Sequence, residues 1–283
     1  MKTLLHISDL QKELRASLDG NKSIGFVPTM GAIHSGHISL IKRSKQENDI
    51  TVCSIFVNPI QFNSEVDLTG YPRMIEQDSK ALIREEVDFL FAPDVVEMYP
   101  PGEETQLDID FGRLDKVMEG KHRPGHFKGV AIVVNKLFDI VKPSRAYFGS
   151  KDFQQLTIIQ HMTRSLKLPV KIVPCKTIRE SDGLAMSSRN LKLTIGERQV
   201  ASEIYGVLMF TKANADSIPV RKLQVIAQKR LAENRAFQVD YFEIVDKRTL
   251  LPINTWDEPE QIIACTAVNI GGIRLIDNME LFS

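Results

Sequence analysis

The sequence lacks an excess of charge of either sign. Lysine and arginine together number 36, and aspartate and glutamate also number 36, so the formal net charge at pH 7 is zero. Proteins that bind nucleic acids usually carry a basic stripe that attracts phosphates over a long range. The balance of charges therefore predicts no nucleic-acid partner, and it gives no reason to expect attraction to an anionic membrane.

Cysteine is scarce as well. The chain has three cysteines, Cys53, Cys175 and Cys265, which are far apart and never form a Cys-x-x-Cys pair. An odd, scattered set excludes a disulfide framework, and without the pair spacing nothing indicates a zinc site. We expect three buried free thiols.

Long hydrophobic runs are also missing. No uninterrupted apolar stretch approaches the roughly 20 residues that cross a bilayer. The first ten residues, Met1–Leu10, become charged and polar too early for a secretion signal. We therefore expect a cytoplasmic protein with no membrane partner.

Two widespread nucleotide-binding motifs do not occur. Neither the P-loop pattern Gly-x-x-x-x-Gly-Lys-[Ser/Thr] nor the dinucleotide pattern Gly-x-Gly-x-x-Gly is present. If the protein binds a nucleotide, it does so with other residues.

The most informative stretch that is present, Ile24–His37, predicts a strand, a turn and the start of a helix. Its β-prone residues are broken at Pro28 and Gly31, and the apolar spacing that follows favours a helix with one buried side. We expect this helix to begin near Ser35, a favourable N-cap residue.

His34 and His37 then lie three residues apart at the first turn of that helix, on one face. The first turn of a helix offers unpaired backbone N–H groups and the positive end of the helix dipole. Gly36 has no side chain that would keep an anion away. The pair therefore predicts a phosphate site, although an isolated His-x-x-His is more often a surface pair or half of a metal site.

The position of this pair in the chain favours the phosphate site. Doubly wound sheets bind nucleotides at the point where their strand order reverses. A strand, a glycine-flanked turn and a helix start are typical of that point. The next apolar run, Ile50–Val57, predicts a strand buried on both faces. Asn58 and Gln61 follow it, so their amides are candidates for substrate contacts.

Two further polar stretches precede predicted helices. Residues 119–127 place Arg123 and neighbouring basic side chains before the apolar helix predicted at 130–141. Gly149 and Lys151 follow a short predicted strand, where a glycine and a lysine can hold a phosphate through backbone N–H groups and a point charge. Gln155 lies one helical turn further on. A basic loop is usually only solvated, so these stretches are supporting evidence for a phosphate site and would not be sufficient alone.

The loop Arg179–Asn190 places two hydroxyls beside an arginine. Ser187, Ser188 and Arg189 can wrap a polyanion, but we expect the loop to be too mobile to do so until it closes. Alternatively, Ser187 caps a short helix.

The rest of the chain predicts two domains with a boundary near residues 176–190. Residues 105–111 alternate in a way that predicts a short strand. Beyond residue 194 the composition favours helices to residue 234, followed by strands at 239–245 and 262–268.

Taken together, these motifs resemble the pantothenate synthetase family. The matching segments, in chain order, are Val27-Pro-Thr-Met-Gly-Ala-Ile-His-Ser-Gly-His37, Phe56-Val-Asn-Pro-Ile-Gln-Phe62, Tyr71-Pro-Arg73, Arg123-Pro-Gly-His-Phe127, Lys151-Asp-Phe-Gln-Gln155, Asp182-Gly-Leu-Ala-Met-Ser-Ser-Arg-Asn190 and Arg274-Leu-Ile-Asp-Asn278. Each segment alone is a weak signal, whereas their joint order across nearly the whole chain is highly specific.

The resemblance implies an α/β fold related to the nucleotidylyltransferases and class I aminoacyl-tRNA synthetases. Residues 1–180 would form a Rossmann-like parallel sheet, and residues 181–283 a smaller α+β lid. It also implies a ligase that condenses pantoate with β-alanine, with ATP as a substrate, Mg²⁺, an adenylate intermediate and a homodimer.

The resemblance assigns roles to individual residues. ATP would be bound by Met30, Gly31, His34, Gly36, His37, Gly149, Lys151, Asp152, Ile178, Met186, Ser187, Ser188 and Arg189. The catalytic residues among these would be His34, His37, Lys151 and Arg189. The substrate would be held by Asn58, Gln61, Arg123 and Gln155, and Asp78 would be a ligand of Mg²⁺. Ser35 and Ser150 stand where the family usually has Asp and Glu, which affects the cap and the turn rather than the reaction.

Two other classes of function stay open on the residues. A cytidylyl- or adenylyltransferase that acts on a phosphorylated alcohol would share the histidine pair. A metal or nucleic-acid module would use His34 and His37 as ligands, although the zero net charge and the lack of further ligands argue against it. No serine or cysteine nucleophile with a base partner stands out, which suits direct attack of a carboxylate on ATP, with catalysis by positioning and charge stabilisation.

Overall fold

The computed structural model describes residues 1–17, 22–103, 105–257 and 261–282. The chain forms two compact units: the first comprises Met1–Phe111, Arg123–Ser150 and Gln155–Lys176, and the second comprises Gly112–His122, Lys151–Gln154 and Thr177–Ser283. The sequence predicted a single domain boundary, between residues 180 and 181. In the structure two short earlier segments join the second unit, because Met118 and Phe153 pack into its core.

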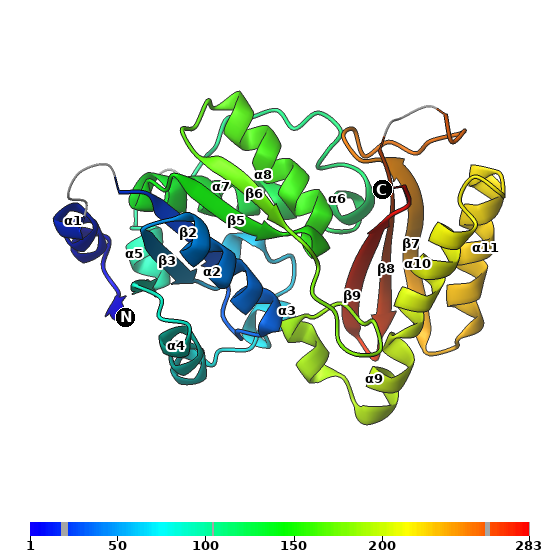
Figure 1. Ribbon diagram of the computed structural model, residues 1–283, viewed down its shortest axis with the longest axis horizontal. Coiled ribbons are helices and arrows are strands. Elements are labelled where there is room, and N and C mark those ends of the chain that lie inside the picture. The colour runs from blue at the N-terminus through cyan, green and yellow to red at the C-terminus, as the bar shows by residue number, and fades with distance from the viewer. Residues whose placement is uncertain (18–21, 104, 258–260, 283) are drawn as a thin grey trace. The chain divides into compact units, whose positions relative to one another are not determined.

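The first unit is built on a parallel sheet of six strands in the order β1-β4-β3-β2-β5-β6 (Figure 1). The strands are β1 (Lys2–Leu4), β2 (Ile24–Thr29), β3 (Ile50–Ile55), β4 (Phe89–Phe91), β5 (Arg145–Gly149) and β6 (Lys171–Cys175). The predicted α/β class with a Rossmann-like parallel sheet is confirmed.

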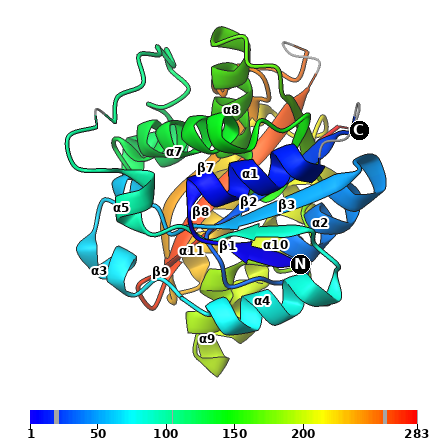
Figure 2. The same ribbon diagram turned by 90° about the vertical axis from the view of Figure 1, so that its left-hand side faces the viewer.

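Helices cover both faces of this sheet. Figure 2 shows α1 and α7 on one face and α2 and α4 on the other. The helices of this unit are α1 (Ile7–Ser17), α2 (Ser35–Glu47), the 3₁₀ turn η1 (Pro59–Gln61), α3 (Glu65–Thr69), α4 (Ile75–Arg84), α5 (Val95–Met98), α7 (His126–Val141) and most of α8 (Phe153–Ser165). Because both faces are covered, β3 is buried at its first five positions, which explains its near-continuous apolar run.

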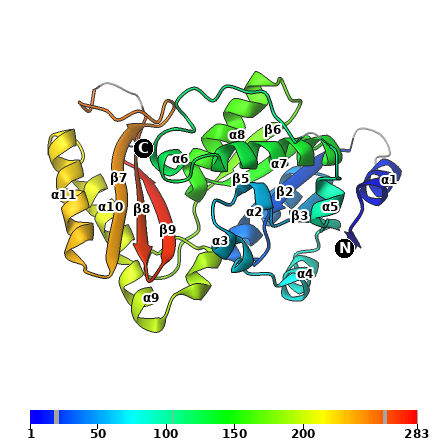
Figure 3. The same cartoon turned by 180° about the vertical axis from the view of Figure 1, so that it is seen from behind.

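The second unit contains the antiparallel strands β7 (Phe237–Asp246), β8 (Ile262–Ile270) and β9 (Ile273–Glu280). Its helices are α6 (Met118–His122), α9 (Ile195–Ala201), α10 (Glu203–Ala213) and α11 (Val220–Glu233), with the 3₁₀ turn η3 (Ser188–Lys192). The 3₁₀ turn η2 (Ser150–Asp152) begins in the first unit. Figure 3 shows α10 and α11 together along one side of the three-stranded sheet.

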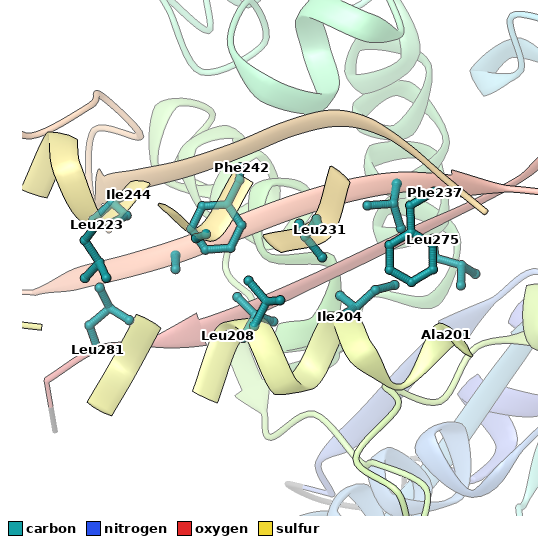
Figure 4. Close-up of a cluster of buried hydrophobic side chains, with 14 of the residues drawn as sticks. Ala201, Ile204, Leu208, Leu223, Leu231, Phe237, Phe242, Ile244, Leu275 and Leu281 are labelled. Atoms are coloured by element: carbon teal, nitrogen blue, oxygen red, sulfur yellow. The ribbon is translucent and has the colours of Figure 1, made fainter. Parts of the chain in front are cut away.

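An apolar core lies between that sheet and its two helices (Figure 4). Leu208 of α10 and Leu223 of α11 meet Phe242 and Ile244 of β7, and all four side chains are at most 1% exposed. Burying one such side chain stabilises a fold by roughly 1.5–3 kcal/mol. The helix–sheet interface therefore gives the second unit a core of its own.

Three details of the secondary structure differ from the prediction. Residues 105–111 form no strand, because their alternating side chains have no neighbouring strand to pair with and only Phe111 is buried. Helix α7 begins at His126, four residues earlier than expected. Strand β9 was not predicted, because its polar residues broke the apolar pattern.

The three cysteines are free and buried, as expected. Complete burial raises the pKa of the Cys53 thiol to about 12, and burial also raises the pKa of Cys175 and Cys265. These thiols therefore stay protonated near neutral pH, where a protonated thiol is a poor nucleophile.

Candidate active site

The strand order reverses between β2 and β5. The chain leads from β2 to β3 on one side and from β5 to β6 on the other, and Phe26 is in register with Ala146. Continuing that register places Thr29, the last residue of β2, level with Gly149, the last residue of β5. In open parallel sheets the carboxyl ends of strands at such a reversal form the usual ligand crevice.

Helix α2 starts directly beyond this edge, and its N-cap is His34 rather than the expected Ser35. The Nδ1 atom of His34 accepts the N–H of Gly36 at 3.1 Å. The Nδ1 atom of His37 accepts the N–H of His34 at 3.3 Å, so the two residues close a capping box. Serine is the commoner cap, but here the imidazole reaches the N–H groups that a hydroxyl usually takes.

These two hydrogen bonds assign the tautomer of both rings. A ring nitrogen that accepts an N–H carries no proton, so the neutral form of each imidazole has its proton on Nε2. Both Nε2–H groups are then hydrogen-bond donors. The ring centroids of His34 and His37 are 4.0 Å apart, so the two donors lie together at the positive end of the helix dipole.

The turn that precedes the helix is held by Asp78. Its Oδ2 accepts the N–H of Ala32 at 2.9 Å, and its Oδ1 accepts the N–H of Ile33 at 2.7 Å. Asp78 is 3% exposed, and a Cβ on Gly31, whose φ is +83°, would lie 2.9 Å from Oδ2. The carboxylate thus fixes the turn that carries His34, while its assignment as a metal ligand stays a prediction.

A network of amides surrounds Gln61, which is 6% exposed. Its Oε1 accepts the Nδ2–H of Asn58 at 3.1 Å, and its Nε2 lies 3.1 Å from Met30 Sδ. Asn58 also donates to the carbonyl oxygen of Gly129 at 3.1 Å and accepts the Tyr99 hydroxyl at 2.9 Å. The structure therefore brings the predicted substrate residue Gln61 into contact both with Asn58, a second predicted substrate residue, and with the predicted nucleotide residue Met30.

Residues that the sequence did not single out complete this network. Burial raises the pKa of Tyr99, so its hydroxyl remains a donor to Asn58. A Cβ on Gly129 would lie 2.5 Å from the carbonyl oxygen of Ile60, so only glycine lets α7 approach η1 this closely. Neither residue carries a local sequence signal, because each acts through a partner far away in the chain.

The predicted substrate residue Arg123 belongs to the same part of the first unit. Its Nη1 lies 3.1 Å from His126 Nε2, and His126 Nδ1 lies 2.8 Å from the carbonyl oxygen of Gln61. A carbonyl only accepts, so Nδ1 of His126 carries the proton and Nε2 accepts from Arg123. His126, at 6% exposure, thus links the guanidinium to the backbone of Gln61.

In the second unit, Lys151 and the loop 179–190 contribute to one pocket. The pocket is lined by Lys151, Ser187, Arg189, Asn190, Arg274 and Asp277, among others. Ser187 is the N-cap of η3, where its hydroxyl accepts the N–H of Arg189 at 3.3 Å. The capping alternative for Ser187 is therefore confirmed.

The loop 179–190 has several internal hydrogen bonds, and the expectation that it is mobile until it closes stays a prediction. Asn190 Nδ2 donates to Glu180 Oε1 and to the Ala185 carbonyl, each at 3.1 Å. The N–H of Met186 donates to the carbonyl of Ile178 at 3.0 Å, and Arg198 pairs with Asp182 at 2.6 Å. These bonds connect the parts of the loop to one another and to the neighbouring residues Ile178 and Arg198.

Two further predicted residues lie at the start of α8 and directly before it. Asp152 pairs with Lys151 at 3.5 Å, and Gln155 lies partly buried in the first turn of α8. Within the described ranges, no group of three or more His, Cys, Asp and Glu side chains is arranged to hold a metal ion. None of the helices in the described part of the chain combines the length and apolar character needed to cross a membrane.

A doubly wound parallel sheet, with hydrogen-bond donors at the helix start beside its reversal point, is typical of the class of α/β proteins that bind nucleotides. The family model for pantoate-beta-alanine ligase matches residues 2–280. The chain therefore belongs to the pantoate-beta-alanine ligase family, and it is an enzyme, a ligase.

The chain is similar to other proteins of this family over almost their full lengths. The chain is 48% identical to a pantothenate synthetase of Azobacteroides pseudotrichonymphae over 281 residues, which cover 99% of each chain. The crystal structure of pantothenate synthetase from Thermus thermophilus superposes with a TM-score of 0.93 at 40% identity and covers 100% of both chains. The pantoate-beta-alanine ligase of Francisella tularensis, crystallised with beta-gamma ATP and beta-alanine, gives a TM-score of 0.82 at 36% identity, covering 99% of this chain and 98% of that one.

Proposed function

We propose that this ligase condenses pantoate with β-alanine, using ATP and forming a pantoyl-adenylate on the way. The observation that carries the proposal is the helix start at His34 and His37, where two Nε2–H donors lie beside the reversal point of the sheet. The complex of the Francisella tularensis relative with beta-gamma ATP and beta-alanine supports the same ligands.

The reaction has two steps. A carboxylate oxygen of pantoate attacks the α-phosphorus of ATP, the bond between the α-phosphorus and its bridging oxygen breaks, and pyrophosphate leaves. The unprotonated amine of β-alanine then attacks the acyl carbon of the mixed anhydride, an amide forms, and AMP leaves with the former carboxylate oxygen. The proton lost by the amine passes to solvent or to a phosphate oxygen.

The protein contributes position and charge to these steps. The Nε2–H groups of His34 and His37 donate to phosphate oxygens, and His37 supplies a proton donor for the departing pyrophosphate. Donors fixed before the reaction are worth about 10²–10³ in rate each, because no reorganisation is needed as negative charge develops. Both rings are fixed in this way by the capping box.

The residues around Gln61 are assigned to pantoate. The amides of Asn58 and Gln61, held by Tyr99 and Gly129, offer polar groups of fixed direction for a carboxylate and two hydroxyls. Gln155 and Arg123 are proposed as further contacts. Met30 lies against Gln61, so the two predicted subsites adjoin in the first unit.

The second unit supplies Lys151, Ser187, Ser188 and Arg189, which we assign to the nucleotide phosphates together with Asp152, Ile178 and Met186. Gly31, Gly36 and Gly149 provide backbone that an anion can approach closely. We propose that Mg²⁺ binds together with ATP, through phosphate oxygens. Mg²⁺ commonly keeps several of its waters and is held by substrate oxygens with few protein ligands. It would neutralise phosphate charge there.

The homodimer and the cytoplasmic location are also proposals that rest on the resemblance. Light scattering after size-exclusion chromatography tests the dimer, which would have twice the 32.0 kDa mass of one chain. A mass of 32.0 kDa at working concentration would contradict it.

The test of the reaction is exchange of labelled pyrophosphate into ATP. We expect exchange with pantoate alone and none without pantoate, because the adenylate step needs only these two substrates. Addition of β-alanine should then release one AMP for each amide formed. Exchange that requires a phosphorylated alcohol and yields no amide would instead identify a nucleotidylyltransferase.

A further inference from the structure

Strand β9 carries two buried polar residues, Asp277 and Asn278, that the mechanism above does not use. Asp277 is 4% exposed and Asn278 is 8% exposed. Strand β9 is the last strand of the sheet order β7-β8-β9, so one of its edges is not paired within this sheet. Burying polar groups is unfavourable unless they are hydrogen-bonded, so their partners indicate what they do.

Asp277 holds the loop 179–190 through Arg179. The guanidinium of Arg179 binds the carboxylate with both ends, from Nη1 to Oδ2 at 2.6 Å and from Nη2 to Oδ1 at 3.0 Å. The same guanidinium donates to the carbonyls of Gly183 at 3.0 Å and Asn278 at 3.1 Å. Burial raises the pKa of Asp277, and the hydrogen bonds and charge of Arg179 oppose that rise.

Arg179 is itself fixed on its other face. Its guanidinium lies over the ring of Tyr205 in α10, 4.6 Å from the centroid. Gly183, with φ +91°, packs so closely against that ring that a Cβ would lie 1.9 Å from it. These contacts hold the loop against β9 and α10. Arg189 belongs to the same loop, so its backbone position depends on them.

Asn278 holds the turn that carries Lys151. Its Nδ2 donates to the carbonyl oxygen of Lys151 at 2.7 Å, and its own N–H donates to Asp277 Oδ1 at 2.7 Å. Successive side chains of a strand point to opposite faces of the sheet. The adjacent residues Asp277 and Asn278 thus fasten two separate segments, the loop and the turn, to one point on β9.

We propose that Asp277 and Asn278 are positioning residues for the nucleotide-binding groups of the second unit. They set the distance between Lys151 and Arg189, two cations that line one pocket together with Asp277. This inference rests on the proposed function, because it assumes that Lys151 and Arg189 act on ATP. Positioning matters energetically, since misplacing a reacting group by about 1 Å costs on the order of 10² in rate.

The test compares Asn278→Leu with Thr211→Val. The first change removes the donor to Lys151 while nearly keeping the side-chain volume. The second removes a hydroxyl in α10 that is 0% exposed and donates to the carbonyl of Val207 at 2.8 Å. Each variant loses a buried side-chain hydrogen bond in the second unit, and such a bond is worth about 1 kcal/mol, but of these two residues only Asn278 donates to Lys151.

We expect Asn278→Leu to lower kcat for pantoate-dependent exchange by about tenfold or more, with the KM for pantoate within about twofold of the wild-type value. Thr211→Val should keep kcat at a similar loss of unfolding free energy. Equal kcat in the two variants would overturn the inference. If Asn278→Leu does not fold, Asn278→Asp, which has the same shape but lacks the donor, must show the same fall in kcat.

The wild-type protein separates this inference from the proposed function. If the wild type shows no pantoate-dependent exchange, the proposed function fails. If the wild type exchanges normally and the Asn278 variants do too, only the positioning role fails.

Discussion

The Nδ1 atom of His37 accepts the backbone N–H of His34 at 3.3 Å, so the backbone of the first histidine orients the ring of the second. Capping boxes usually pair a serine or threonine with a glutamate or glutamine three residues later. Here two imidazoles fill both places, and each accepts a backbone N–H through its Nδ1 atom. We have proposed that the same rings also contact phosphate, so the capping role and the proposed phosphate role need to be tested separately.

The first prediction separates these functions at His34. Asparagine is also a good N-cap, so His34→Asn should unfold within about 0.5 kcal/mol of wild type, whereas His34→Ala should lose about 1 kcal/mol. Both variants lose the ring donor, so both should exchange pyrophosphate about 10²–10³ more slowly. Urea unfolding and exchange rates measure the two effects. Full activity of His34→Asn would show that the ring is needed only as a cap.

The second prediction concerns Asp78, whose two oxygens each accept a backbone N–H. Asp78→Asn keeps one acceptor and leaves the other N–H unpaired in a buried site, which should cost about 1–3 kcal/mol. Asp88→Asn is the control, because Asp88 accepts the N–H of Thr51 with a single oxygen. If Asp78 acts only by holding the turn, the Mg²⁺ concentration for half-maximal activity stays unchanged. An increase confined to Asp78→Asn would support the metal-ligand assignment instead.

The third prediction concerns the contact between α7 and η1. In Gly129→Ala the new methyl would lie 2.5 Å from the Ile60 carbonyl oxygen and 2.8 Å from the Cα of Gln61. We expect a loss of about 1–3 kcal/mol in unfolding free energy and a raised KM for pantoate, because Gln61 must move. Gly206→Ala in α10 meets no atom within 4 Å and should leave KM unchanged. A normal KM for pantoate in Gly129→Ala would contradict the assignment of Gln61 to the substrate site.

The fourth prediction is a pH dependence at Asp182. Hydrogen bonds from Arg198, at 2.6 and 3.1 Å, hold the pKa of Asp182 below its usual value. A lowered folded-state pKa means that the stabilisation is present above the unfolded pKa of about 3.9 and is lost as the pH falls through the lower folded value. Because the Asp182 side chain is 38% exposed, solvent screening limits the effect to about 0.2–1 kcal/mol.

Urea unfolding of Asp182→Asn between pH 3 and pH 7 measures that effect, since asparagine keeps an acceptor for the N–H of Leu184. The variant should be less stable than wild type by a constant amount from about pH 5 to pH 7, and the difference should shrink below about pH 3.9. A difference that does not change with pH would show that the ion pair contributes nothing.

The sequence predicted those parts of the fold and site that depend on local pattern. A strand, a turn and a helix start follow one another within fourteen residues of Ile24–His37, so the reversal-point site could be predicted from them. The cap at His34 could not, because serine has the higher average preference and the histidine pair had to be seen in three dimensions.

Strand β9 and its contacts depend on residues far apart in the chain. Asp277 is buried because Arg179, 98 positions earlier, neutralises it, and Glu119 is buried against Arg274, 155 positions later. Locally such residues indicate an exposed polar segment, since charged side chains are rarely buried without a partner. Only the tertiary pairing makes Ile273–Glu280 a strand and turns its polar residues inward.

The most direct test of the central claim is the rate of pantoate-dependent pyrophosphate exchange in His37→Ala and Lys151→Ala, at saturating ATP and pantoate. Each variant loses a donor to the phosphates, so the rate should fall at least about 100-fold. His37→Gln, which keeps a usual capping-box residue at the third helical position, should fall similarly while it folds as stably as wild type. Near-normal exchange in His37→Ala or Lys151→Ala would contradict the account.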